Sequence, residues 1–268
     1  MLLRYVNLWF SLAKFSLLGE LAFRGNFLIK IFVELLWLGI LLLFNYTIFQ
    51  QTTSIADWNA QQYFFFIGCY FAMGGLIEML FLDNCNQFAD LVRSGDLDFF
   101  LLRPIDEQFL VSCKHVDWSC APNIILGAVI MSLALWQIGW TFDTIQVGIF
   151  LVLFASGAAL AYGFLLILMS ASVWLMRNQS LFEMWWLFTT LMRYPSEIFK
   201  GPWAQPTGWF FFFVIPIMLV TNVPARVMVR PLLEPWLACY AIAAAIVVVA
   251  ASRYIFRAAL QHYRSASS

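Results

Sequence analysis

Apolar residues gather in long runs along this chain, and polar residues are confined to short intervals between the runs. A helix needs roughly 20 mostly apolar residues to cross the hydrocarbon core of a bilayer. We therefore predict an all-α polytopic membrane protein that forms one transmembrane domain over residues 1–268. Its six predicted transmembrane helices cover about 27–49, 63–82, 121–138, 145–175, 180–196 and 236–256.

The first residues follow a different pattern. Between residues 2 and 22, the polar side chains of Arg4, Asn7, Ser11 and Lys14 recur at three- and four-residue spacing. This spacing predicts an interfacial helix that lies in the lipid headgroups, with its basic side chains toward anionic lipid. A spanning helix is the weaker alternative, because a charged side chain at mid-bilayer costs about 2.5–3.5 kcal/mol.

Charge is densest between Asp83 and Glu107, in an otherwise apolar sequence. The interval begins with a predicted short amphipathic helix, which Gly95 is well placed to end because glycine tolerates the left-handed conformation found after helices. A second apolar strip, 97–102, runs into Pro104, which bars continuation of a helix. These features predict a compact knob at the membrane surface, and an ordinary solvated loop is the alternative. The predicted apolar face carries Cys85, Phe88, Leu91 and Val92, and the polar face carries Asn84, Gln87, Asp90 and Arg93.

The pattern changes again between residues 196 and 235, where six prolines interrupt an apolar region. The core run 209–220 is shorter than the roughly 17–25 residues that a spanning helix needs. We predict a broken, re-entrant hairpin over 206–230 that is buried against protein, since irregular backbone is not tolerated against lipid. One full span is the alternative.

Composition agrees with a membrane protein. Of the 268 residues, 63% are hydrophobic and only 11% are charged, whereas a soluble domain has about 25% charged residues. The 15 basic and 15 acidic residues give no net charge, which argues against a nucleic-acid partner because such a partner requires a basic face. The five cysteines are scattered and form no C-x-x-C pair, so they indicate reduced thiols rather than a disulfide framework or a zinc site.

Six spans place both termini on the same side of the membrane, and the basic residues indicate which side. Positively charged residues favour the cytoplasmic side. The side with the termini and the charged interval has the larger share, so we predict that both are cytoplasmic. It holds Arg4, Lys14, Arg24, Lys30, Arg93, Arg103, Lys114, Arg177, Arg253, Arg257 and Arg264, against Arg193, Lys200, Arg226 and Arg230 on the other side.

Motifs that carry chemistry are missing from the sequence. It contains no G-x-x-x-x-G-K-[ST], no H-E-x-x-H and no G-x-S-x-G, so energy for any work would come from a partner. Glu78 and Glu183 are acids within predicted spans and are candidates for a substrate pathway, although a local structural role is favoured for Glu78. Lys30 and Glu34 lie four residues apart near the start of a span, which predicts a structural pair on one helix face or snorkelling to the interface.

Five segments, taken in order, resemble one family over essentially the whole chain. They are RYVNLWFSLAKFSLLGELAFRGNFLIKIFVELLWLG, VRSGDLDFFLLRPID, RYPSEIFKGPW, FVIPIMLVTNVPARVMV and HYRSASS. The sequence is similar to the six-helix membrane permeases of type II ATP-binding-cassette (ABC) exporters, in a bacterial branch. The resemblance implies an N-terminal interfacial helix, a cytoplasmic coupling helix between the second and third spans, and a re-entrant outer element before the last span.

The resemblance also implies partners. Two permease chains, identical or related, would assemble with two ATPase subunits in the bacterial inner membrane, surrounded by lipid. ATP and magnesium would be bound by the ATPase, with no cofactor in this chain. The coupling helix, which docks in a cleft of the ATPase, falls on 84–94. Docking is expected from Phe88, Asp90, Leu91, Val92 and Arg93, with Gly95, Asp96 and Asp98 shaping the exit. A membrane scaffold and a membrane-embedded enzyme are the alternatives to a transporter.

Overall fold

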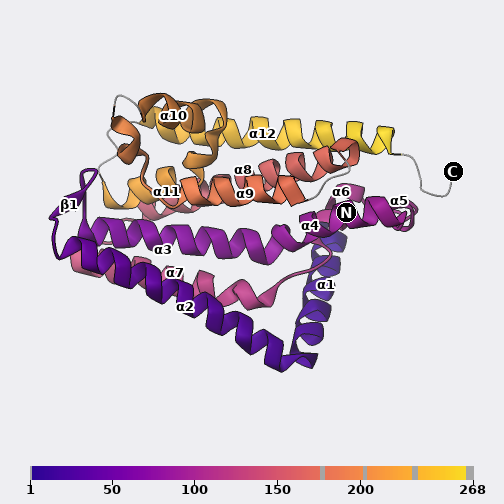
Figure 1. The fold of residues 1–268 in the computed structure, drawn as a ribbon, viewed down its shortest axis with the longest axis horizontal. Coiled ribbons are helices and arrows are strands. Elements are labelled where there is room, and N and C mark those ends of the chain that lie inside the picture. Colours follow the sequence, from indigo (N-terminus) through magenta and orange to yellow (C-terminus); the bar gives the residue numbers. More distant parts are fainter. Residues whose placement is uncertain (1, 176–178, 202–203, 231–234, 264–268) are drawn as a thin grey trace.

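The computed structural model describes residues 2–175, 179–201, 204–230 and 235–263, which form a helical bundle with one short β-hairpin (Figure 1). Arg177 and Arg264, which entered the charge argument, lie outside the described residues. The longer helices are α1 (Leu2–Ala22), α2 (Arg24–Phe49), α3 (Ala60–Ile77), α4 (Asp83–Ser94), α7 (Ala121–Ile138), α8 (Thr144–Leu175), α9 (Gln179–Met192), α11 (Leu219–Val229) and α12 (Pro235–His262). The short elements are β1 (Ser54–Ile55), β2 (Trp58–Asn59), η1 (Glu78–Leu82), α5 (Leu97–Leu101), α6 (Glu107–Cys113), η2 (Trp118–Cys120), η3 (Ser196–Lys200), α10 (Gln205–Trp209), η4 (Phe210–Val214) and η5 (Pro216–Met218).

Five helical stretches in the described part of the chain are long and apolar enough to cross a membrane, which confirms the predicted fold class. They are Arg24–Phe49, Ala60–Ser94, Trp118–Ile138, Thr144–Trp174 and Pro235–His262. The predicted fifth span is shorter than expected, since α9 has 14 residues and ends at Met192. Pro195 disfavours helical geometry at the residue before it, Tyr194, so the helix does not continue through this position.

Close helix packing depends on glycine, as two of the contacts illustrate. A Cβ atom at Gly68 of α3 would lie 2.8 Å from the carbonyl oxygen of Gly127 in α7, and one at Gly157 of α8 would lie 2.5 Å from the carbonyl oxygen of Val220 in α11. Both approaches are too tight for any side chain. Gly74 of α3 differs, because a Cβ there would meet nothing within 4 Å.

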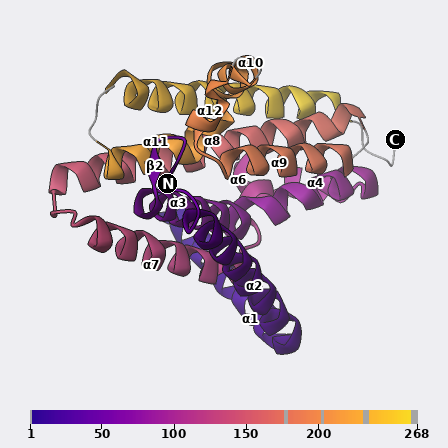
Figure 2. The ribbon, with the colours of Figure 1, turned by 60° about the vertical axis from the view of Figure 1, so that its left-hand side comes forward.

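Helix α1 runs across the long axis of the bundle (Figure 1), and it projects from the bundle together with the first part of α2 (Figure 2). The two helices meet at Phe23, whose φ of −110° and ψ of 52° break the helical path. An orientation transverse to the spanning helices is the one predicted for an interfacial helix.

The proline-rich region folds as a broken helix pair, in which 205–214 and 216–229 are bent by 76°. The start of α11 lies beside Gly157, near the middle of α8. Its end lies near the starts of α3 and α8, where the Gln62 side chain donates to the Val229 carbonyl at 3.3 Å and the Gln146 side chain donates to the Val227 carbonyl at 2.7 Å. Helix α11 therefore runs only from mid-bundle to one end, a geometry that a re-entrant hairpin and a broken span share.

A β-hairpin replaces the plain polar loop predicted between the first two spans. Ser54 pairs with Asn59 and Ile55 pairs with Trp58, and the two turn residues adopt positive φ. The Trp58 ring is fully buried, and the Arg230 guanidinium lies 4.4 Å from its centre. This contact joins the hairpin to the end of α11.

Candidate coupling site

The charged interval does not begin as a separate helix. Helix α3 continues through the π-helical turn η1 into α4, so that 60–94 forms one helical path. The predicted span over 63–82 and the predicted amphipathic helix after it are therefore continuous with one another. At this boundary, Asn84 and the backbone of His115 exchange hydrogen bonds of 2.7 and 3.0 Å, and His115 Nδ1 lies 3.3 Å from an Asp83 carboxylate oxygen.

The apolar face of α4 is covered by the same chain, contrary to expectation. Phe88 is 0% exposed, and its ring centre lies 5.9 Å from that of Phe256 in α12. Leu91 and Val92 are partly buried against the same core. The sequence left no obvious segment to cover this face, but α8 and α12 extend far enough to do so. Phe88 is therefore a core residue and is not available for docking.

The exposed part of the interval is its tip, which we define as residues 95–105. Gly95 adopts a φ of 80° after α4, as predicted for a helix-ending glycine. The five-residue helix α5 follows, with Leu97 buried in the core. Phe99 and Leu102 point the other way and are 66% and 82% exposed. The tip thus presents two large apolar side chains that no described residue covers.

Charged and polar groups surround the tip. Asp90 and Arg93 form an exposed ion pair with each other on the last turn of α4. The Ser94 hydroxyl donates to the Asp96 carboxylate at 2.8 Å, which supports the turn at Gly95. Asp98 lies in the first turn of α5. The predicted polar residues therefore lie at the tip or directly before it, whereas Phe88 is buried in the core.

The segment that follows the tip is attached to α12 by a group of polar side chains, which we call the clamp: Asp106, Gln108 and Arg253. Asp106 begins α6, where its carboxylate accepts a hydrogen bond from the Phe109 backbone at 3.1 Å. The Arg253 guanidinium donates to Asp106 at 2.7 Å and to Gln108 at 3.0 Å. Burial alone would raise the pKa of Asp106, but the hydrogen bonds from Arg253 and Phe109 outweigh it and hold the pKa below its ordinary value.

The clamp extends to two further helices. The Gln108 side chain donates to the Tyr162 hydroxyl of α8 at 2.8 Å, and this hydroxyl donates to Ser112 at 3.1 Å. On the other side, the Asp106 backbone N–H donates to the Tyr5 hydroxyl of α1 at 3.2 Å. The exit from the tip is thus hydrogen-bonded to α1, α8 and α12. No local pattern in the sequence reveals this clamp, because Asp106 and Arg253 are 147 residues apart and no periodicity connects them.

The two candidate pathway residues, Glu78 and Glu183, lie in different parts of the bundle. Glu78 begins the π-helical turn and interacts electrostatically with Glu34 and Asp117. Glu183 is exposed on α9, which packs against α8 and α11. The structure therefore gives no shared site to the two candidate pathway residues.

The predicted pairing of Lys30 with Glu34 is replaced by longer-range partners. Lys30 Nζ lies 3.3 Å from an Asp117 carboxylate oxygen, and Glu34 accepts a hydrogen bond from the Asn123 side chain at 2.8 Å. The segment 114–118 approaches α2 and supplies Asp117, which no helical spacing within α2 reveals.

Comparison with known families identifies the chain. A family model described as "ABC-2 family transporter protein" matches residues 35–267. The chain belongs to the ABC-2 transporter family. Comparisons with curated proteins and with solved structures gave no match. As an ABC-2 permease, the protein is a membrane subunit of an ABC transporter. The tip and the clamp residues Asp106, Gln108 and Arg253 lie within the matched residues, whereas Tyr5 precedes them.

Proposed function

We propose that this ABC-2 permease belongs to an exporter in the bacterial cytoplasmic membrane and is coupled to a separate ATPase subunit through the tip at 95–105. Both termini lie in the cytoplasm, and the broken pair 206–230 enters the membrane from the outer side. ATP and magnesium are bound by the ATPase, and a second permease chain, identical or related, completes the pathway.

One observation carries the coupling role. Phe99 and Leu102 are exposed at the tip, while the exit from the tip is held by hydrogen bonds at Asp106. Exposed apolar anchors are suited to a partner cleft, since a few large apolar residues supply most of the energy of a protein interface. The tip is free to bind a partner through its apolar side chains, and its exit is held to the bundle by hydrogen bonds. A movement of the partner can therefore be passed to the bundle through this segment.

The path of the displacement follows from the clamp. When the ATPase subunits close on ATP, a movement of the tip pulls on Asp106, and Arg253 carries that movement to α12. Gln108 carries it to Tyr162 of α8. Helices α8 and α12 pack along one another, so they move together and change access to the pathway between the two permease chains. The outward direction of transport rests on the family resemblance.

The test compares two pairs of apolar residues at opposite ends of the bundle. Phe99→Ala with Leu102→Ala should weaken co-purification of the cognate ATPase by about thirtyfold, as expected from a loss of roughly 2 kcal/mol at interface anchors. The matched control is Phe142→Ala with Ile145→Ala, because these residues are equally exposed near the start of α8. The alternative is that membrane lipid, and not the ATPase, contacts the apolar side chains of the tip. Normal ATPase binding by the tip variant would reject the assignment, whereas equal losses in both variants would indicate a general folding defect.

A further inference from the structure

A cleft opens inside the angle between α1 and α2, away from the tip. It has a volume of about 420 Å³ and lies where α2 begins. The elbow formed by α1 and the first part of α2 projects from the bundle (Figures 1 and 2). Three aromatic side chains and five polar or small residues of the two helices line it, together with His115. The lining residues are Phe15, Ser16, Gly19, Glu20, Phe23, Asn26, Phe27, Lys30 and His115.

The polar lining contains both signs of charge. Glu20 accepts a hydrogen bond from the Trp118 backbone through Oε1 at 2.9 Å, but its Oε2 is buried and accepts none within the described residues. A buried carboxylate oxygen without a donor is costly, so the site is suited to a ligand that can donate a hydrogen bond there. Lys30 keeps nearly half of its side chain exposed while it pairs with Asp117, which leaves ammonium hydrogens free to bind an anion.

His115 adds to the positive side of the cleft. Its hydrogen bond to Asp83 raises its pKa, an effect that burial opposes in part. The Lys30 ammonium and an imidazole N–H of His115 are suited to a phosphate group, while Glu20 is suited to an ammonium group. The cleft therefore has complementary partners for both ends of a zwitterion.

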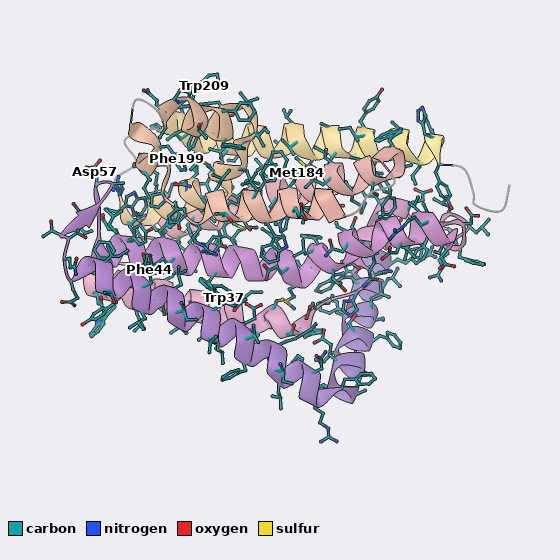
Figure 3. All side chains as sticks on the ribbon, in the orientation of Figure 1. Trp37, Phe44, Asp57, Met184, Phe199 and Trp209 are labelled. Carbon is teal, nitrogen blue, oxygen red and sulfur yellow. The ribbon has the colours of Figure 1, made fainter. Side chains whose placement is uncertain are left out.

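The apolar lining is suited to the rest of an amphiphile. Phe15 and Phe23 are exposed beside the polar groups, and the elbow opens onto the long exposed side of α2. Trp37 and Phe44, labelled in Figure 3, are 58% and 59% exposed farther along that helix. Acyl chains can follow this side of α2, because a spanning helix with few buried residues faces lipid along its length.

We propose that the cleft between α1 and α2 binds the headgroup of an aminophospholipid, with the ammonium at Glu20 and the phosphate at Lys30 and His115. The primary ammonium of phosphatidylethanolamine donates hydrogen bonds, whereas the quaternary ammonium of phosphatidylcholine does not. The site consequently prefers phosphatidylethanolamine to phosphatidylcholine. This inference does not depend on the ATPase coupling.

The experiment uses the full-length protein reconstituted in bilayers that contain equal amounts of phosphatidylethanolamine, phosphatidylcholine and phosphatidylglycerol. The protein is then purified in mild detergent, and the retained lipids are quantified by mass spectrometry. The wild type should retain more phosphatidylethanolamine than phosphatidylcholine. Glu20→Gln should reduce that preference roughly three- to tenfold, which corresponds to one charge-assisted hydrogen bond in a partly exposed site. Lys14→Gln on the same helix is the control and should leave the preference unchanged.

A second variant removes the space and keeps the charges. A Cβ atom at Gly19 would meet nothing within 4 Å, so Gly19→Leu should fold and fill the cleft, displacing the lipid. Gly25→Leu is the matched control, because Gly25 has equal free space but does not line the cleft. Retention of phosphatidylethanolamine by Gly19→Leu at the wild-type level would overturn the proposal. Equal retention of the three lipids by the wild type would also overturn it, and preferential retention of phosphatidylglycerol would indicate a purely anionic site instead.

Discussion

The clamp between Asp106 and Arg253 offers a test of how movement leaves the tip. Arg253→Met removes two charge-assisted hydrogen bonds, of 2.7 and 3.0 Å, while it keeps a long apolar side chain in place. Each bond would be worth about 1.5–3 kcal/mol if fully shielded. The Arg253 side chain is 41% exposed and that of Asp106 is 29% exposed, so screening reduces the loss of stability to about 1 kcal/mol. We expect the variant to fold and to bind its ATPase.

The expected defect is in transmission. Spin labels are placed at positions 142 and 236, in a background with Cys239→Ser, because Phe142 and Trp236 are exposed near the starts of α8 and α12. In the wild-type complex, ATP should shift the distance between the labels, and in Arg253→Met this shift should be lost although ATP is still hydrolysed.

Arg257→Met is the control for Arg253→Met, because Arg257 acts on Asp106 only as a more distant charge. The measurement is done near neutral pH. The lowered pKa of Asp106 means that the ion pair is intact above the ordinary Asp pKa of about 3.9 and is lost only as the pH falls through the lower value. An unchanged ATP-dependent shift in Arg253→Met would refute the path through α12.

Three further outcomes are expected. Phe88→Ala should lower the free energy of unfolding by about 3–5 kcal/mol, because the ring is fully buried, and a thermal melt in detergent that is unchanged would contradict this core position. The raised pKa of His115 means that its ion pair stabilises the protein below about pH 6.5 and is lost as the pH rises through the higher folded-state pKa. The melting temperature of wild type should therefore exceed that of His115→Gln at about pH 6, and the difference should shrink by about pH 9; a constant difference would argue against the pair. A reporter that is active only in the cytoplasm should work after Ser268 and fail at Thr53, and the opposite pattern would invert the proposed topology.

Local signals in the sequence predicted much of the fold. Helix α7 begins and ends where expected, because Pro122 occupies the first helical turn and Gly139 adopts the left-handed conformation that ends the helix. Gly95 ends α4 for the same reason. These features depend on residues within one turn of each other, so the sequence alone is enough to locate them.

Features that depend on distant partners could not be predicted in the same way. The path from α3 into α4 is continuous because the backbone of His115 satisfies Asn84, and no pattern around residue 84 indicates that partner. Phe88 looked free because its cover, Phe256, comes from the last helix. Exposed Phe99 and buried Leu97 lie in one short apolar strip, and only the packing of the tip separates them.

The central claim is that the tip, rather than the apolar face of α4, contacts the ATPase. Site-specific photo-crosslinking measures this directly, with a photoreactive amino acid placed at position 99, 88 or 142 of the full-length permease in native membranes. The account predicts an ATPase crosslink from position 99, where Phe99 is exposed, and none from position 88, where Phe88 is enclosed, or from position 142 near the start of α8. A crosslink from position 142, or only lipid adducts from position 99, would contradict it.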